Sequence, residues 1–182
     1  LLGDTLKFVA GPQTDYFRSP DGSVVNNSAV IFTEVDNTKP FTFTAKVQPE
    51  FTETGTYSAG VIYAYENDTH CQKLCFEQDE YGDHRVVSVR TLGTSDDNNH
   101  QAITAPYVYM RLSSDGTTLG SYFSEDGKIW RMARLYKNDF PEKLLIGISS
   151  QSPKDNEHTC LFTEVSLTDK PVADFRKGNI AE

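Results

Sequence analysis

The sequence predicts an all-β fold, an antiparallel sandwich of two sheets with little or no helix. Two Asp-Gly pairs divide residues 107–136 into three short segments, as in a three-stranded meander. Other strand-like segments recur at the spacing of about 8 to 12 residues that is typical of sandwiches and barrels. No apolar repeat of helical period persists along the chain.

The first segment of the meander alternates apolar and polar side chains. Val108, Met110 and Leu112 fall on one side of the strand, because successive side chains point to opposite faces. Tyr109 and Arg111 fall on the other. The apolar side is therefore expected to face the core, and the Asp-Gly pairs suit the positive φ angles of tight hairpin turns.

The same patterns place the other elements in chain order. We expect loops at residues 11–27, rich in turn-forming residues, and at 92–105, which carries the run TSDDNNH. Residues 143–149 form a nearly continuous apolar run, typical of a strand covered on both sides. The further strands are expected at residues 5–9, 29–33, 41–47, 60–65, 72–77, 86–91, 143–149 and 160–167.

The alternation also predicts the core between the two sheets. The residues expected to point inward are Phe41, Phe43, Leu74, Phe76, Val87, Val89, Val108, Met110, Leu112 and Leu144.

Composition limits the partners. The 182 residues are expected to form one domain, 1–182, and the formal net charge of −9 argues against nucleic acid and anionic membranes as partners. No segment approaches the roughly 20 apolar residues that span a bilayer.

The cysteines and the N-terminal segment bear on the compartment. Cys71, Cys75 and Cys160 are odd in number, so we expect a reduced, cytoplasmic protein. The segment LLGDTLKF shows no signal peptide. Glycosylation sequons at Asn26 and Asn67 leave secretion as the alternative.

Several short stretches occur in an order and spacing that match a known group. They are TDYFR at 14–18, AG at 59–60, KLCFE at 73–77, SVRT and TSDDN between 88 and 98, YMRL at 109–112, SEDGKIW at 124–130, IGISSQSP at 146–153 and CLFTEVSL at 160–167. The chain thereby resembles the concanavalin A-like lectin/glucanase superfamily. Within it, the resemblance is to stand-alone jelly-roll domains related to β-xylosidase C-terminal domains, including fungal regulators of enolase expression.

This resemblance implies a jelly-roll sandwich whose concave face holds a ligand in the sugar-binding relatives. In two places the chain departs from the family pattern. In the family pattern an acidic residue often precedes the AG pair, where this chain has Tyr57-Ser58. An aromatic residue often precedes the KxxxE strand, where this chain has Cys71-Gln72.

The polar sides of the central strands predict a ligand-binding face. Aromatic rings stack on the apolar face of a sugar, and charged groups hydrogen-bond its hydroxyls. A solvated sheet face laced with ion pairs is the alternative. The expected concave-face residues are Tyr63, Tyr65, Lys73, Glu77, Arg90, Tyr109 and Arg111, and Asp96 and Asp97 are expected in a loop at its rim.

The run Glu77-Gln78-Asp79-Glu80 suggests a second possibility. Glycosidases of the superfamily carry paired carboxylates on one strand, and Glu77 and Asp79 could share a face. However, residues 79–83 look like a hairpin turn, so we predict no catalytic residue and no enzyme. A glycoside hydrolase using Glu77 remains the alternative.

Other motifs support no metal or cofactor. The histidines form no ligand pair, and no phosphate-binding or dinucleotide-binding motif occurs. SEDGKIW resembles the sialidase Asp box, so we expect Ser124 and Asp126 to hold a turn and Trp130 to pack in the core.

We therefore predict a non-catalytic module that binds a carbohydrate or small metabolite. The family resemblance links it to carbohydrate metabolism and to control of enolase expression. A protein-interaction domain that has lost its sugar site, with a protein partner, is a further alternative.

Overall fold

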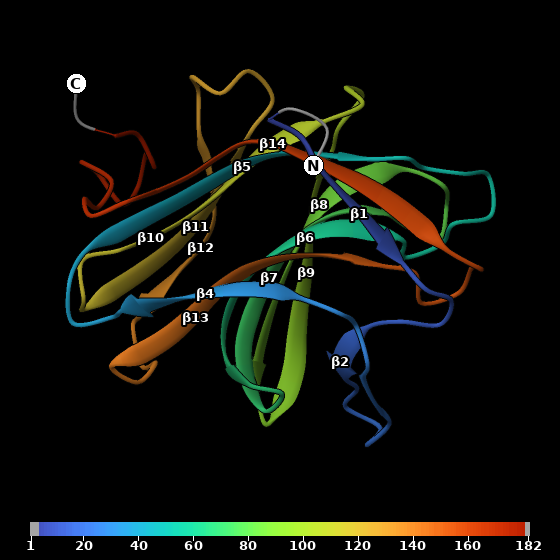
Figure 1. Cartoon of the computed structure of the whole chain (residues 1–182), viewed down its shortest axis with the longest axis horizontal. Helices are drawn as coiled ribbons and strands as arrows, with labels where there is room; N and C mark the ends of the chain where they lie inside the picture. The colour runs from blue at the N-terminus through green and yellow to red at the C-terminus, as the bar shows by residue number, and fades with distance from the viewer. Residues whose placement is uncertain (1–3, 181–182) are drawn as a thin grey trace.

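The computed structural model describes residues 4–180, whose strands form two six-stranded sheets and one two-stranded sheet, with no helix (Figure 1). Residues 1–3, where the segment searched for a signal peptide begins, and 181–182 lie outside the described residues. The strands are β1 Leu6–Ala10, β2 Tyr16–Arg18, β3 Val24–Asn26, β4 Ile31–Asp36, β5 Phe41–Pro49, β6 Ala59–Asn67, β7 His70–Gln78, β8 His84–Leu92, β9 Thr94–Ala102, β10 Val108–Ser114, β11 Thr118–Ser124, β12 Arg131–Lys137, β13 Lys143–Gln151 and β14 His158–Thr168.

The two large sheets pack face to face as a sandwich. The first sheet has the order β1-β14-β5-β10-β11-β12 and the second the order β4-β13-β6-β7-β8-β9. Their neighbouring strands are antiparallel. The predicted all-β sandwich is thus confirmed, and the described residues contain no helix that could cross a membrane.

The central meander is also confirmed. Strands β10, β11 and β12 lie side by side, and Gly116 and Gly127 occupy the turns with φ angles of 88° and 71°. In the second turn, Asp126 Oδ1 accepts hydrogen bonds of 2.8 Å from the amides of Lys128 and Ile129. The Asp-Gly pairs therefore act as the turn chemistry predicts.

Most of the predicted core lies between the sheets, on what we call their inner faces. Phe41, Phe43, Leu74, Phe76, Val108, Met110, Leu112 and Leu144 are buried there together. Val87 and Val89 are the exceptions, because they belong to a separate apolar cluster on the outer face of the second sheet. Their neighbour Ser88 points inward instead and hydrogen-bonds Arg134 of β12. Alternation separated the two faces of β8 correctly but assigned the wrong one to the core.

Both predicted loops contain strands. Residues 11–27 include β2 and β3, which pair as a hairpin that lies against the second sheet (Figure 1). Residues 92–105 include β9, which pairs with β8 at the edge of that sheet. Polar, charged sequences are common on edge strands, where one side of the backbone has no partner, so composition alone indicated a loop.

Gly60 of β6 lies at a close contact between the two sheets. A methyl group there would lie 2.5 Å from Val47 Cγ1 and closer still to Cys160 Sγ. We expect Gly60→Ala to lower the free energy of unfolding by about 1 to 3 kcal/mol through overpacking, as measured by urea denaturation. Gly11→Ala, where no atom lies within 4 Å, is the control and should cause no loss. Equal stability of both variants would contradict this packing.

Candidate functional site

A cavity of about 700 Å³ opens on the outer face of the second sheet. Its base is formed by side chains of β7, β8 and β9. The N-terminal segment, residues 11–27, forms one wall, and residues 151–154 close one end. We call this cavity the pocket.

The N-terminal segment is held over the sheet by its own hydrogen bonds. The backbone amide of Arg18 donates to Ser95 Oγ at 3.0 Å, and the Arg18 Nε donates to the Gly93 carbonyl at 2.9 Å. The β2–β3 hairpin thereby turns Phe17 and Val25 toward the pocket. This segment of turn-forming residues becomes a wall because Arg18, near its middle, is hydrogen-bonded to the β8–β9 turn and the start of β9.

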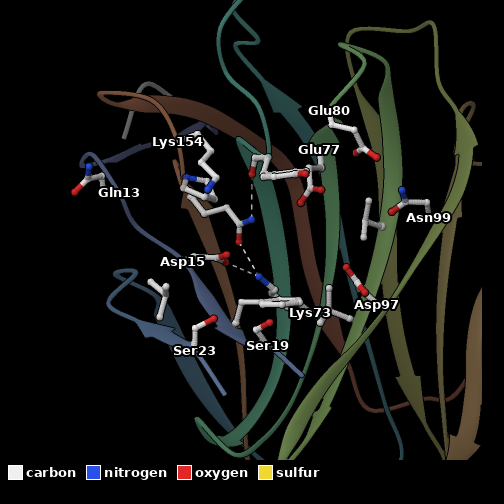
Figure 2. A pocket seen from close by; sticks show the side chains of 17 residues that line it. Gln13, Asp15, Ser19, Ser23, Lys73, Glu77, Glu80, Asp97, Asn99 and Lys154 are labelled. Atoms are coloured by element: carbon white, nitrogen blue, oxygen red, sulfur yellow. Dashed lines mark hydrogen bonds and ion pairs between the residues drawn. The ribbon is translucent and has the colours of Figure 1, made fainter. Parts of the chain in front are cut away.

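Lys73 lies at the base of the pocket and is 2% exposed. Its Nζ donates to Asp15 Oδ1 at 2.6 Å and to Gln151 Oε1 at 3.1 Å (Figure 2). Gln151 in turn donates from Nε2 to the Tyr57 carbonyl at 3.2 Å. Burial alone would lower the pKa of Lys73, but the Asp15 carboxylate raises it above its usual value, so the ammonium stays charged.

Glu77 follows Lys73 on the same side of β7 and projects into the pocket (Figure 2). Burial raises its pKa from 4.5 to about 8, Lys73 opposes this shift, and Asp15 and Asp97 add to it. No described residue hydrogen-bonds its carboxyl group. Glu77 is therefore a half-buried carboxyl that changes charge near neutral pH.

The remaining base of the pocket combines apolar and polar groups. Val87 and Val89 are almost fully buried and lie opposite Asn99 and Asp97 of β9 in the strand register. Figure 2 shows Asp97 and Asn99 on the side of the pocket across from Asp15. The pocket therefore has an apolar base on β8 and a polar rim on the neighbouring strand β9.

Three of the sequence-predicted residues line this pocket: Lys73, Glu77 and Asp97. Tyr63 and Tyr65 share their side of the sheet but are covered by other aromatic rings. Tyr63 is fully buried, and Tyr65 stacks on Phe32 at a centroid distance of 4.9 Å. The prediction of exposed sugar-stacking tyrosines is wrong here, because the outer face is itself covered.

Arg90 and Asp96 point away from the pocket, toward the first sheet. Arg90 pairs with Asp139 at 2.5 Å and lies over the Tyr136 ring at 4.2 Å. Asp96 pairs with Arg134 at 3.2 Å. The prediction that Arg90 belongs to the ligand-binding face is wrong for the same reason as the prediction that Val89 belongs to the core. The inner and outer faces of β8 are the reverse of those predicted. Asp96 and Asp97 lie on strand β9, not in a loop, and face opposite ways.

Tyr109 and Arg111 lie on β10, in the other sheet, and point away from the core. Arg111 is 5% exposed, stacks on Trp130 at 3.6 Å and donates to the Gly178 carbonyl at 2.6 Å. They do not meet Lys73 and Glu77, because the chain passes from the second sheet to the first between β9 and β10. Trp130 is half-buried on that outer face and is not a core residue.

Sequence reasoning missed the wall residues of the pocket, of which Asp15, Phe17, Tyr57, Asn99 and Gln151 are the main ones. The signal that could have found two of them is the TDYFR stretch, which places an acid and aromatic rings in a turn-rich segment.

Asp79 does not form a carboxylate pair with Glu77. Its Oδ1 accepts from the amides of Tyr81 and Asp83 at 2.9 Å, and Oδ2 accepts from Arg85 Nε at 2.6 Å. Burial opposes, but these hydrogen bonds lower the pKa of Asp79. The expected hairpin turn is present, and Asp79 is its organising residue. Within residues 4–180, no three His, Cys, Asp or Glu side chains gather in a way that could hold a metal ion.

A family model described as "Protein of unknown function (DUF1349)" matches residues 2–170. The chain belongs to this family. No curated protein matches it. A functionally unknown protein from Saccharomyces cerevisiae has the same fold, with a TM-score of 0.83, 23% identity and coverage of 93% of this chain and 90% of that one.

Two carbohydrate-related structures share the DUF1349 chain's fold at lower similarity. The GH43 BlXynB protein from Bacillus licheniformis gives a TM-score of 0.69 at 14% identity, with coverage of 91% of this chain but only 33% of that one. The carbohydrate binding module CBM66 from Bacillus subtilis gives 0.52 at 10% identity, covering 78% of this chain and 83% of that one. These likenesses establish the fold alone and confirm the jelly-roll prediction.

Lys73→Met should destabilise the protein by about 3 to 5 kcal/mol, because it leaves the Asp15 carboxylate without its counter-ion. Hydrogen exchange of the amides of residues 15–27 should speed up in parallel. Lys39→Met, which removes an exposed surface pair with Asp36, is the matched control and should leave the stability almost unchanged. Unchanged exchange in Lys73→Met would show that the ion pair does not hold the segment.

Glu77→Gln should become more stable than the natural protein as pH rises from about 5 to 8. The folded protein keeps the Glu77 proton up to about pH 8, whereas the unfolded chain loses it near 4.5, so ionisation of Glu77 penalises only the folded state. We expect a gain of roughly 1 to 3 kcal/mol at pH 8.5 and none at pH 4, measured by urea unfolding. Glu80→Gln changes an exposed rim carboxyl and is the control; the same gain there would contradict the assignment.

Proposed function

We propose that this protein is a non-catalytic module that binds a small carbohydrate, or a metabolite of similar polyhydroxyl chemistry, in the pocket. The observation that carries the proposal is the combination of an apolar base, Val87 and Val89, with the buried polar anchor Lys73 in one cavity. Its volume of about 700 Å³ lies within the range of roughly 300 to 1,000 Å³ that is common for small-molecule sites.

The chemistry of the pocket suits a sugar ring. A pyranose has apolar C–H faces, which pack against valine side chains and aromatic rings such as Phe17. Its hydroxyl groups both donate and accept, so carboxyl and amide groups such as Asp97 and Asn99 can bind them in pairs. Each such hydrogen bond contributes roughly 0.5 to 1.5 kcal/mol net.

The fold relatives support the proposal without deciding it. One of them is titled a carbohydrate binding module, and others are titled GH43 proteins, of whose length this chain spans about a third. Since one fold hosts many functions, the proposal depends on the residues of the pocket and not on this likeness.

The positions of Asp97 and Asp79 do not support retaining glycoside hydrolysis in which either residue pairs with Glu77. Lys73 pairs with Val89, and Val89 with Asp97, so Asp97 lies two strands across and four residues along from Glu77. Strand geometry puts the two Cα atoms about 16 Å apart. Retaining hydrolysis needs carboxyl groups about 5 to 5.5 Å apart, and Asp79 is committed to its turn.

We propose further that ligand binding serves regulation of carbohydrate metabolism in the cytoplasm, including enolase expression. The sequence resemblance to regulators of enolase expression supports this role. Enolase transcript levels would be measured in cells that lack the gene and in cells in which the gene is restored as a variant with a blocked pocket. The cytoplasmic location would be tested by following a tagged form of the protein. Unchanged transcript levels would contradict the regulatory role.

Filling the pocket tests the binding site. Val25 and Val24 are neighbours on β3, both exposed, but only Val25 lines the pocket. We expect Val25→Trp to weaken binding of any sugar found in a calorimetric screen of neutral mono- and oligosaccharides at least tenfold, because the indole occupies the cavity. The matched control, Val24→Trp, should bind normally. No binding by any sugar, or equal loss in both variants, would contradict the proposal.

A further inference from the structure

We infer that the ligand of this pocket carries no negative charge: the pocket takes a neutral sugar or polyol and excludes the corresponding uronic acids and sugar phosphates. The inference rests on the proposed function, because it concerns the same pocket. Two independent observations carry it, the distribution of charges around the cavity and the state of the buried ammonium group at its base.

The charges that line the pocket are mostly acidic. Four of its lining residues are acids and two are bases: Asp15, Glu77, Glu80 and Asp97 against Lys73 and Lys154. The Asp15–Lys73 pair, at 2.6 Å, cancels one charge of each sign. This leaves three carboxyl groups on the β7 and β9 side, facing a single exposed lysine on the loop opposite.

None of these three carboxyl groups is neutralised by a partner. The described residues offer no ion pair to Glu77, Glu80 or Asp97, in contrast to Asp96 on the other face of β9, which pairs with Arg134. A negatively charged ligand group would therefore meet the carboxylates of Asp97 and Glu80, and above about pH 8 also that of Glu77. Like charges repel strongly in a cavity partly shielded from water.

The ammonium group of Lys73 offers a ligand one donor but no free charge. An ammonium has three N–H groups, and Asp15 and Gln151 accept two of them. Lys73 lines the pocket and its third N–H has no acceptor among the described residues, so this N–H can donate to a ligand oxygen. A hydroxyl or ring oxygen satisfies this donor completely, since Asp15 already supplies the counter-charge.

A ligand carboxylate or phosphate at this position would instead compete with Asp15. Two anions would then share one lysine, and a lysine is a point charge that lacks the forked geometry with which arginine holds such groups. Displacing Asp15 would also remove one of the contacts that hold the N-terminal segment, which forms the wall of the pocket. Sharing Lys73 between two anions and displacing Asp15 are both unfavourable. A neutral hydrogen-bond acceptor is therefore the group that suits this position.

Matched pairs of sugars test the inference. The probes are glucose with glucuronic acid, galactose with galacturonic acid, and mannose with mannuronic acid, each pair differing only at C6, with glucose 6-phosphate added. Binding is measured by isothermal titration calorimetry at pH 7.5. For each pair that binds, we expect the neutral sugar to bind at least tenfold more tightly than its uronic acid.

The outcomes separate this inference from the proposed function. A uronic acid or sugar phosphate that binds as tightly as its neutral counterpart overturns the inference while the proposed function stands. Absence of binding by every neutral and every acidic sugar refutes the proposed function and the inference with it.

A variant separates charge from steric exclusion at C6. Asp97→Asn keeps the shape of the rim but removes one charge, so it should reduce the preference for the neutral sugar at least threefold. Asp96→Asn, on the opposite face of β9, is the matched control and should leave the preference unchanged. An unchanged preference in Asp97→Asn would assign the exclusion to shape and overturn the charge argument.

The pH dependence supplies a second measurement of the same effect. The groups that act on Glu77 are Lys73 on its own strand, Asp15 on the N-terminal wall, Asp97 on β9 and Asp79 in the turn. Ionisation of Glu77 adds one negative charge to the pocket, so the preference for the neutral sugar should increase between pH 6.5 and 9. Glu77→Gln should abolish this increase, and a preference that falls with pH would contradict the inference.

Discussion

The ion pair between Lys73 and Asp15 converts a sheet face into a pocket. Lys73 lies in the middle of β7, among buried neighbours, where an unpaired ammonium would be strongly unfavourable. Asp15 supplies its counter-charge at 2.6 Å and, in doing so, holds the N-terminal segment over β7 and β8. Because a buried charge is tolerated only with its partner, the position of the wall and the charge at the base depend on each other.

The covered outer face explains the burial pattern of the second sheet. In β7 the residues on both sides are buried, since one side meets the first sheet and the other meets the N-terminal segment. Because the N-terminal segment covers this outer face, Val87 and Val89 form the base of the pocket, and Tyr63 lies beneath Tyr16 and Phe32. The sandwich core and the pocket therefore share one sheet, with apolar side chains on each of its faces.

The pocket is built largely from segments outside the central strands. Its wall comes from a hairpin whose strands have three residues each, and its rim from an edge strand. A fold shared with proteins 10% to 23% identical does not determine such segments, because connecting segments and edges tolerate change more readily than packed strands. Glu77 and Lys73, by contrast, belong to a central strand and would keep their positions in any sandwich of this topology.

Local pattern alone determined that this chain is all-β, that residues 107–136 form a meander, and that Lys73 and Glu77 share one side of a strand apart from Leu74 and Phe76. Those features follow from side-chain alternation and turn chemistry, which act between near neighbours. Only the tertiary structure decided that Arg111 lies in the other sheet, that Val89 and not Arg90 faces the pocket, and that Asp15 reaches Lys73. A period of two separates the faces of a strand but does not say which face is inner when both are covered, nor which distant strand lies beside it.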